Sequence, residues 1–432
     1  MITELALIVF TETYPFDAGA EAMFLAPELE ALRSRFSEIT VIPQYIRGKR
    51  LSVPPSVSVE TSYAKQRTSL GALRKLRYAA RALTFKALWL EFLSAMPNVR
   101  RVRSFESAVR RRIDAQYARD WVWRFIALRQ IDVSKSVFYT YWLSPVTDGL
   151  VLSKKGNLRA PQIVVSRAHG GDLYEERATA FARLPGRRDT LAGLERLVLI
   201  SEHGRDYVSR RYPSQNGYIV SRLGVPDPGD VAPASSDGVF RVVSCSFLRA
   251  LKRIELLFEG LIVLASERPT VAIEWTHIGG GELWQKIQDR VSRESPRNLS
   301  CQLVGSIDND EVIRRYTSYP VDVFINVSST EGLPVSIMEA QSCGIPVVAT
   351  DVGGTPEIVS NRVGFLLPSN PSPAIIASAL IKVMEDPASS LEQRTASRDN
   401  WRQRFDAERN YHDFARTLQS LVVGNGNDVS HS

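Results

Sequence analysis

Short apolar runs alternate with stretches of helical apolar spacing along the whole chain. Most of the runs are continuous rather than alternating, which is typical of strands that have helices on both faces. The pattern therefore predicts an α/β fold of doubly wound parallel sheets. The predicted strands are Leu5–Phe10, Ile39–Pro43, Val137–Trp142, Gln162–Arg167, Leu197–Ser201, Arg241–Ser246, Ala272–Ile278, Gln302–Val304, Val323–Val327 and Val347–Ala349, with helices such as Arg253–Ala265 and Gly281–Val291 between them.

One segment breaks this alternation. Residues 225–238 hold three prolines and two glycines without any period, which indicates a linker. We therefore expect a first Rossmann-like domain at 1–225, a linker at 226–238 and a second such domain at 239–422, whose last helix returns to the first domain. The polar residues 423–432 are expected to be disordered.

Composition excludes several classes of protein. With 44% hydrophobic and 23% charged residues, the 432-residue chain is neither disordered nor fibrous. Its three cysteines, Cys245, Cys301 and Cys343, are too dispersed for a disulfide framework or a zinc site, and we expect them to be inert core residues in a reducing compartment. No secretory signal is expected, because no basic residue precedes the short apolar run at the N-terminus. No spanning segment is expected, because the best candidate, residues 82–96, carries Lys86 and Glu91.

The charge is concentrated in one segment. Residues 65–129 hold 16 Lys+Arg and 4 Asp+Glu, whereas the rest of the chain holds 38 and 43. Within this segment Leu73, Leu76, Ala80, Leu83, Ala87 and Leu90 follow a helical period, and Arg74, Lys75, Arg77, Arg81 and Lys86 lie off that line. We favour a helix that lies on an anionic membrane surface. The alternatives are a helix with its apolar face packed inward, and, least favoured because no binding motif accompanies the charge, a nucleic-acid surface.

The strongest local motif runs from Val327 to Ala340. It follows a predicted strand, and Pro334 suits the first turn of a helix that ends near Gly344. The free N–H groups of Val335 and Ser336 at such a helix start can bind a diphosphate. Two carboxylates flank this position: Glu331 on the loop and Glu339 inside the helix. Carboxylates accept hydrogen bonds from sugar hydroxyls, although a plain structural role near a helix N-terminus is the alternative.

With its continuation to Glu357, this motif resembles the retaining glycosyltransferases of family 4, which have a GT-B fold of two facing Rossmann-like domains with a cleft between them. Further segments resemble that family in chain order. They are the loop around Gly19 and Glu21, Ser166–Tyr174 with His169 and Asp172, Ser244–Arg253 with Lys252, the glycine turn His277–Glu282, and Leu303–Asn309.

The resemblance implies a role for each matching residue. Glu331 would bind donor-sugar hydroxyls, Glu339 the nucleotide ribose, Lys252 the leaving diphosphate and His169 the sugar. The remaining donor contacts would come from Gly332, Leu333, Val335, Ser336, Gly280, Ser306 and Ile307, and the acceptor side would comprise Gly19, Glu21, Asp172 and Trp142. Asp172 is also a candidate N-cap for a helix at 173–180, and Thr355 a candidate N-cap with Pro356 at the first helical position.

Two positions depart from the family pattern. Phe247 stands where the family commonly has an arginine, and Arg249 or Arg253 is the candidate replacement for its charge. The first glycine loop has Gly19 alone, between Ala18 and Ala20, where many members have two glycines.

These observations predict a cytoplasmic enzyme, peripheral at the inner membrane face. It would move a hexose with retention from a nucleotide-diphosphate sugar to a lipid-linked or growing saccharide in bacterial surface polysaccharide synthesis. No cofactor, metal ion or nucleic acid is expected. The alternatives are a soluble transferase with a small-molecule acceptor and a non-catalytic module that binds sugar nucleotides.

Overall fold

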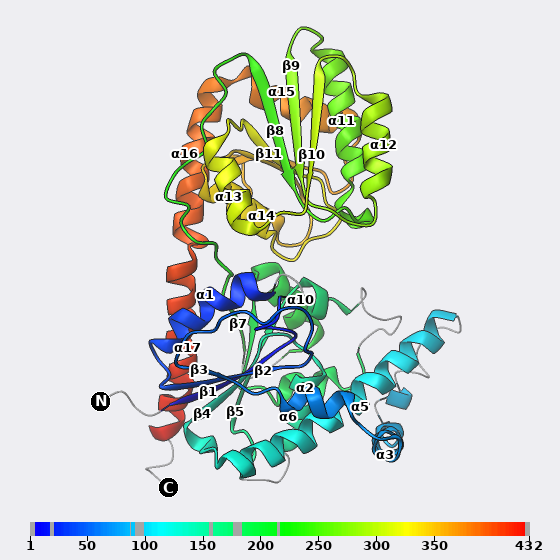
Figure 1. Cartoon of the computed structure of the whole chain (residues 1–432), viewed down its shortest axis with the longest axis vertical. Coiled ribbons are helices and arrows are strands. Elements are labelled where there is room, and N and C mark those ends of the chain that lie inside the picture. The colour runs from blue at the N-terminus through cyan, green and yellow to red at the C-terminus, as the bar shows by residue number, and fades with distance from the viewer. Residues whose placement is uncertain are drawn as a thin grey trace. The chain divides into compact units, whose positions relative to one another are not determined.

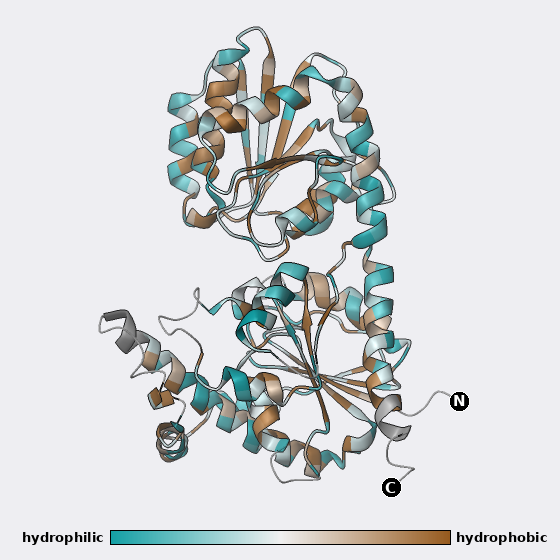
Figure 2. Cartoon of the chain, turned by 180° about the vertical axis from the view of Figure 1, so that it is seen from behind, coloured by the Kyte–Doolittle hydropathy of each residue, from teal (hydrophilic) through white to brown (hydrophobic). Residues whose placement is uncertain are grey.

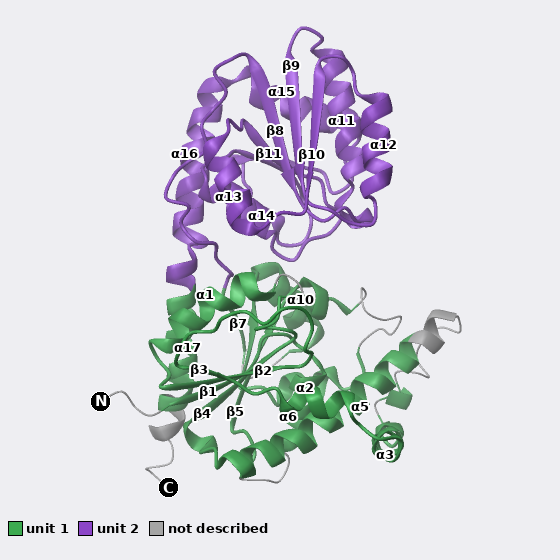
Figure 3. Cartoon of the chain, in the orientation of Figure 1, with its two compact units in different colours: residues 1–221, 411–432 green, residues 222–410 purple. Residues whose placement is uncertain are grey.

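The chain forms two compact units, which Figure 3 colours separately. The computed structural model describes residues 5–17, 21–86, 88–90, 99–154, 159–175, 184–213 and 217–427, with the backbone only at 99–103 and 424–427. Unit 1 comprises residues 1–221 and 411–432, and unit 2 comprises residues 222–410.

Unit 1 is built on a seven-stranded parallel sheet in the order β3-β2-β1-β4-β5-β6-β7 (Figure 1). Its strands are β1 (Ala6–Thr11), β2 (Glu38–Pro43), β3 (Val57–Val59), β4 (Ser136–Thr140), β5 (Ile163–Ala168), β6 (Arg196–Leu199) and β7 (Tyr218–Val220). Its helices are α1 (Glu21–Arg33), α2 (Ser62–Thr68), α3 (Ala72–Leu83), α5 (Val99–Arg129), α6 (Pro145–Lys154), α7 (Gly170–Leu173), α9 (Arg187–Ala192), α10 (Glu202–Arg211) and α17 (Ala407–Asn427), with a 3-10 turn at Val133–Lys135.

Both faces of this sheet are buried, as the continuous apolar runs predict. Ile8 and Phe10 of β1 belong to a core that includes residues of α5, α6, α9 and α10. Leu7 and Val9, which point to the other face, belong to a second core with residues of α1 and α17. The C-terminal helix is thus part of the unit that the N-terminal segment forms. Figure 2 shows the hydrophobic strands that result.

Unit 2 has a six-stranded parallel sheet in the order β10-β9-β8-β11-β12-β13. Its strands are β8 (Val239–Cys245), β9 (Ala272–Ile278), β10 (Leu299–Gly305), β11 (Val323–Asn326), β12 (Val347–Thr350) and β13 (Gly364–Leu367). Its helices are α11 (Ile254–Glu267), α12 (Trp284–Glu294), α13 (Asn309–Ser318), α14 (Val335–Ser342), α15 (Pro373–Glu385) and α16 (Pro387–Arg404), with 3-10 turns at Ala250–Lys252 and Thr355–Glu357. One core of this unit gathers residues of β8, β9, β11, α11, α12 and α15.

The structure confirms the doubly wound α/β architecture and adds three short strands, β3, β7 and β13, that the apolar pattern did not reveal. The segment 226–238 is not a free linker. Ala232 is buried and donates a backbone hydrogen bond to Cys343, and Val321 donates one to Pro233, which hold the segment against unit 2. The tail also differs, because α17 continues to Asn427 and includes the first residues of the segment expected to be disordered.

Candidate functional site

Lys252 and Glu331, which lie 79 positions apart in the sequence, meet in unit 2. The Lys252 Nζ atom lies 2.6 Å from Glu331 Oε1. Lys252 ends the 3-10 turn before α11, and Glu331 lies in the loop between β11 and α14. The Asn326 side chain, at the end of β11, donates a second hydrogen bond of 3.2 Å to the same carboxylate oxygen. Sequence reasoning overlooked Asn326, although a polar residue that ends an apolar strand was a visible signal.

The helix that follows has an open N-terminus. Pro334 is the N-cap of α14, and its carbonyl accepts the Ile337 N–H. The first N–H groups of a helix have no acceptor within the helix and need one from outside it. Within the described chain, no acceptor meets the N–H groups of Val335 and Ser336. The predicted anion-binding geometry at this helix start is therefore present, with Lys252 and Glu331 from the adjoining loops.

Two glycines support the loop that carries Glu331. Gly353 has φ +55°, and a Cβ there would lie 1.9 Å from the Glu331 carbonyl oxygen. Gly354 donates a 2.9 Å hydrogen bond to the Gly332 carbonyl, and its own Cβ position is blocked by the same residue. Gly332 is thus fixed by backbone contacts. The 3-10 turn that follows has Gly354 as its N-cap and Thr355 as its first residue, so the prediction of Thr355 as the cap was wrong by one position.

Glu339 is nearly inaccessible, because α14 turns it toward the interior. It is 4% exposed, and burial raises the pKa of its carboxyl to about 8. Within the described chain no side chain donates a hydrogen bond to this carboxyl. A buried acid without a partner is costly, which makes Glu339 a candidate ligand-binding group rather than an ordinary helix residue.

The glycine turn after β9 brings Gly280 next to Ser306. A Cβ on Gly280 would lie 2.9 Å from Ser306 Oγ, and Gly279 donates a 2.8 Å hydrogen bond to the Gly305 carbonyl. Two predicted donor-binding residues from different loops are therefore neighbours. Ile307 follows Ser306 and is half-buried.

Arg253 is committed to the protein backbone. Its guanidinium donates to the carbonyl oxygens of Val327 (2.6 Å), Ser328 (2.8 Å) and Ser369 (2.9 Å), and to Asn370 Oδ1 (3.2 Å). Its contact with the diphosphate stays a prediction, because Nη1 carries two N–H groups and, within the described chain, makes only the one bond to Asn370. Arg249 is exposed and lies over the Phe247 ring, with 5.5 Å between Cζ and the ring centroid.

In unit 1, His169 is buried between two aromatic residues. The centroids of the Trp142 and Tyr141 rings lie 4.2 Å and 5.0 Å from that of His169. Both of its ring nitrogens are buried, and among the described residues neither has a hydrogen-bond partner. Burial, with the nearby Arg167 charge, holds the pKa of His169 well below its ordinary value, so the neutral ring predominates at pH 7. A buried neutral imidazole with unused nitrogens can meet a sugar hydroxyl.

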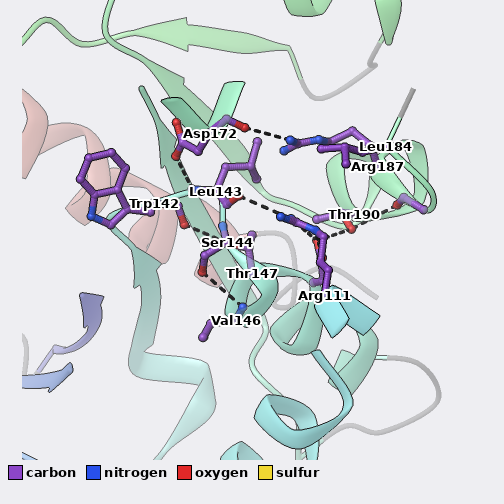
Figure 4. Close-up of polar contacts among 12 residues, drawn as sticks. Arg111, Trp142, Leu143, Ser144, Val146, Thr147, Asp172, Leu184, Arg187 and Thr190 are labelled. Carbon is purple, nitrogen blue, oxygen red and sulfur yellow. Dashed lines mark hydrogen bonds and ion pairs between the residues drawn. The ribbon is translucent and has the colours of Figure 1, made fainter. Parts of the chain in front are cut away.

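The two acids predicted on the acceptor side bind their own backbone. Asp172 accepts the N–H groups of His169 (2.6 Å) and Leu143 (2.7 Å; Figure 4), and burial raises its pKa to about 6. It lies inside α7, whose N-cap is His169, so Asp172 is not itself an N-cap; most of the helix expected at 173–180 lies outside the described residues.

Glu21 accepts the N–H groups of Glu12, Thr13 and Tyr14 at 2.7–2.8 Å and the Trp142 indole N–H at 2.8 Å. Glu21 therefore holds the loop after β1 in place. Its two carboxylate oxygens already accept four N–H groups. Gly19 lies outside the described residues.

A buried charge network beside His169 was missed by sequence reasoning. Arg167 Nη2 lies 2.8 Å from Glu28 Oε2 with both side chains fully buried, and Arg167 Nε donates to the Tyr139 hydroxyl at 2.9 Å. The guanidinium also lies 4.3 Å from the Phe414 ring centroid of α17. A lone arginine in an apolar strand gives no clue to a partner 139 positions away.

Comparisons with known proteins bear on the unit that contains Lys252 and Glu331. A family model described as "Glycosyl transferases group 1" matches residues 242–404. Among curated proteins, the amylovoran biosynthesis glycosyltransferase AmsK of Erwinia amylovora is 26% identical over 280 residues, 61% of this chain and 65% of that protein. A GDP-mannose-dependent mannosyltransferase of Corynebacterium glutamicum is 23% identical over 54% of this chain and 64% of its own length. The chain thus matches just under two thirds of the length of these relatives.

The fold is shared with solved structures along nearly the whole chain. Anabaena HepE, solved in complex with UDP, gives a TM-score of 0.64 at 16% identity, covering 96% of this chain and 99% of that one. Sucrose-phosphate synthase from Thermosynechococcus elongatus gives 0.67 at 16% identity, covering 97% and 100%. The chain has the GT-B fold of two Rossmann-like units, as predicted. The family match, by contrast, is confined to residues 242–404, within unit 2.

Proposed function

We propose that this chain is a retaining glycosyltransferase of family 4 that transfers a hexose from a nucleotide-diphosphate sugar to a saccharide acceptor. The observation that carries the proposal is the ion pair of Lys252 and Glu331 next to the open N-terminus of α14. A cation and two free amides suit a diphosphate, and a carboxylate suits sugar hydroxyls. Both halves of a sugar nucleotide are thereby matched by neighbouring groups.

In the proposed reaction the donor separates this ion pair. The diphosphate takes the Lys252 ammonium and the amides of Val335 and Ser336, and the released Glu331 carboxylate accepts hydroxyls of the donor sugar. Glu339 binds the ribose. The bond between the anomeric carbon and the diphosphate oxygen breaks while the acceptor oxygen bonds to the same face of that carbon. The acceptor proton passes to the leaving diphosphate, whose charge Lys252 stabilises. No cofactor or metal ion takes part in this scheme.

The acceptor is proposed to be a lipid-linked or growing saccharide at the inner face of the membrane. The evidence is the surface of α3. Leu73 and Leu76 are 84% and 68% exposed, and Arg74, Lys75 and Arg77 beside them are also exposed. The inward-packed alternative does not fit, because α3 buries Tyr78 and Ala82 instead. Exposed leucines among basic residues suit an anionic lipid surface. Among the described helices none is long and apolar enough to cross a membrane.

The names of relatives support this choice of pathway and donors. AmsK is named for amylovoran biosynthesis, and an Escherichia coli relative, 28% identical over 36% of this chain, is named for O-antigen biosynthesis. HepE was solved with UDP and with UDP-glucose, and the Corynebacterium relative is named for GDP-mannose. We therefore propose bacterial surface polysaccharide synthesis, with UDP-hexoses as the first donors to test.

The test is a screen of nucleotide sugars for thermal stabilisation and slow hydrolysis, since a ligand that binds the native state raises the melting temperature. The panel comprises UDP-glucose, UDP-galactose, UDP-N-acetylglucosamine and GDP-mannose, each with and without a chelator. We expect one donor to stabilise the protein and to be hydrolysed in both conditions. A folded protein that responds to none of them would contradict the enzyme and favour a non-catalytic module.

Variants of the ion pair test the site itself. Lys252→Ala and Glu331→Ala should each lower turnover by at least about 100-fold, because each removes a charge that acts on the transition state. Lys286→Ala is the matched control, since this exposed lysine forms an ion pair on the surface of α12. Full activity in both site variants would refute the assignment.

A further inference from the structure

The sheet of unit 2 ends on one side in a long edge strand, β10 (Figure 1). Among the described residues it pairs with β9 alone. It has seven residues, whereas the other edge strands of the two sheets, β3, β7 and β13, have three or four. A bulge between Leu303 and Gly305 leaves regular pairing over residues 299–303. The outer backbone groups of an edge strand can pair with a further strand, so proteins usually keep such edges short, charged or covered.

β10 lacks the side chains that usually block pairing at an edge. Residues 299–305 contain neither a charged residue nor a proline. Ser300 and Gln302 are exposed on one face of the strand, and Cys301 and Leu303 are only half-buried on the other. All four residues of β11, inside the same sheet, are buried. The outer side of β10 is therefore a neutral, partly exposed surface that another strand can complete.

The helix beside this edge is also uncharged on one side. Lys286 and Arg290 of α12 form ion pairs with acidic residues of α11. The side of α12 that faces away from α11 consists, at helical spacing, of Gln285, Gln288, Ser292 and the C-cap residue Ser295. Ser295 Oγ lies 3.6 Å from Cys301 Sγ, so this side of the helix adjoins β10. The neutral surface thus continues from the strand onto the helix.

Opposite charges flank β10. Arg297 precedes the strand and Asp308 follows it, and both side chains are exposed. Among the described residues neither forms an ion pair. If Cys301 or Gln302 lies opposite its own copy in an antiparallel pair, Arg297 comes opposite residue 305 or 307 of the second copy, next to Asp308. Each end of the paired strands then joins a cation to an anion.

A second copy of the chain is the partner that this surface fits. Each copy has a net charge of +7, so two copies repel each other except where their surfaces are neutral or self-complementary. The edge of β10 is neutral along its length and complementary at its ends. A two-fold axis requires such self-complementarity, because the same patch meets itself.

We infer that β10 is a dimer interface, at which two copies pair antiparallel and join their six-stranded sheets into one continuous sheet. An axis perpendicular to the sheet keeps each face on its own side, so one residue of β10 lies opposite its own copy. The regular segment places this residue at Cys301 or Gln302. Lys252 and Glu331 are not part of this interface, so dimerisation does not depend on the proposed reaction.

The first experiment is sedimentation velocity of the full-length protein from about 1 µM to about 100 µM. We expect the wild type to form dimers within this range. Gln302→Lys places like charges near the axis and should weaken dimerisation by at least about tenfold. Gln403→Lys, which adds the same charge at an exposed glutamine of α16, is the control and should dimerise like the wild type. A wild type that stays monomeric, or equal dimerisation of the two variants, would overturn the inference.

Exchange of the flanking charges tests the antiparallel arrangement. Arg297→Asp and Asp308→Arg should each weaken dimerisation by about fivefold or more, because each brings like charges together at both ends. The double variant should recover, since both ion pairs form again with their charges exchanged. Arg293→Asp, at an exposed arginine of α12, is the control. A double variant as weak as the single ones would contradict antiparallel pairing.

Disulfide cross-linking locates the axis. Directly opposite Cβ atoms lie about 4.5–5.5 Å apart, close enough for a disulfide after a small shift. Under oxidation we expect a covalent dimer of the wild type, through Cys301, or of Gln302→Cys combined with Cys301→Ser. Ser300→Cys combined with Cys301→Ser is the control on the same strand and should stay uncross-linked. No cross-link in the first two proteins, or equal cross-linking of all three, would overturn the pairing. Donor hydrolysis is measured separately, so failure of the proposed function would not affect these outcomes.

Discussion

Arg253 Nε donates a 2.6 Å hydrogen bond to the carbonyl oxygen of Val327, the residue that follows β11. Arg253 itself has φ +51°, a left-handed conformation that is rare outside glycine, directly after Lys252. Its other donors hold Ser328 and the 369–370 segment. Arg253 thus fixes the start of the loop that carries Glu331, while its neighbour Lys252 pairs with Glu331 directly.

Arg253→Met should lower the free energy of unfolding by about 2 kcal/mol, because several carbonyl oxygens lose a charged donor. Turnover should fall through misplacement of Glu331, with little change in the affinity for the free nucleoside diphosphate. Urea unfolding and nucleotide titration check the two parts. Arg249→Met, at an exposed position nearby, is the control for stability. A large loss of nucleotide affinity in Arg253→Met would instead support the predicted contact between Arg253 and the diphosphate.

Glu339 should make stability fall as the pH rises. Its carboxyl keeps the proton up to a pKa of about 8 in the folded state, whereas the unfolded chain releases it near the ordinary value of 4.5. Between these values the native state binds more protons, so the free energy of unfolding declines by at most about 1.4 kcal/mol per pH unit from this group.

The substitution Glu339→Gln isolates this contribution. Thermal unfolding followed from pH 5 to pH 8 should show the variant gaining stability relative to the wild type as the pH rises. A difference between the two proteins that stays constant with pH would show that Glu339 is ionised in the fold.

The buried pair of Arg167 and Glu28 should be sensitive to loss of one partner. Arg167→Met leaves the Glu28 carboxylate buried without its cation and should cost about 3–5 kcal/mol of unfolding free energy. The double variant Arg167→Met with Glu28→Leu should recover most of this loss, because no unpaired charge remains. Equal instability of the single and double variants in urea unfolding would mean that packing, not charge, is responsible.

The basic face of α3 should bind anionic vesicles. Reversal of Arg74, Lys75 and Arg77 to glutamate should weaken binding to phosphatidylglycerol vesicles by at least about 100-fold, since each basic residue contributes about 1 kcal/mol. Arg81 is left intact because it lies 3.5 Å from Asp120. The control reverses Arg293, Arg362 and Lys382, three exposed cations of unit 2. Equal vesicle binding by both variants would mean that net charge alone, and not the basic face of α3, determines vesicle binding.

The sequence located most of the sheet, because continuous apolar runs identify buried parallel strands whatever their neighbours. It missed β3, β7 and β13, which are three or four residues long. Such strands are stabilised by pairing with a neighbour in the sheet, as Ile39 pairs with Val57, and not by a pattern of their own.

The candidate site was predictable where chemistry is local. The strand, glycine turn and helix start around Glu331 lie within one segment, so spacing alone indicates an anion site next to a carboxylate. The sequence could not say that Asp172 and Glu21 bind backbone amides, because a carboxylate can bind either the backbone or a ligand. The sequence also could not predict that Leu73 and Leu76 of α3 are exposed, since an amphipathic pattern does not show which face of a helix is covered.

The sequence by itself determined the fold class, the motif at α14 and the residues that carry charge, because each depends on order along the chain. Only the tertiary structure decided how these charges are satisfied: Lys252 and Arg167 form ion pairs with Glu331 and Glu28, and Arg253 donates hydrogen bonds to carbonyl oxygens. The physical reason is that a hydrogen bond or ion pair acts over a few ångströms of space, and residues 74 to 139 positions apart reach that distance only after the sheets have formed.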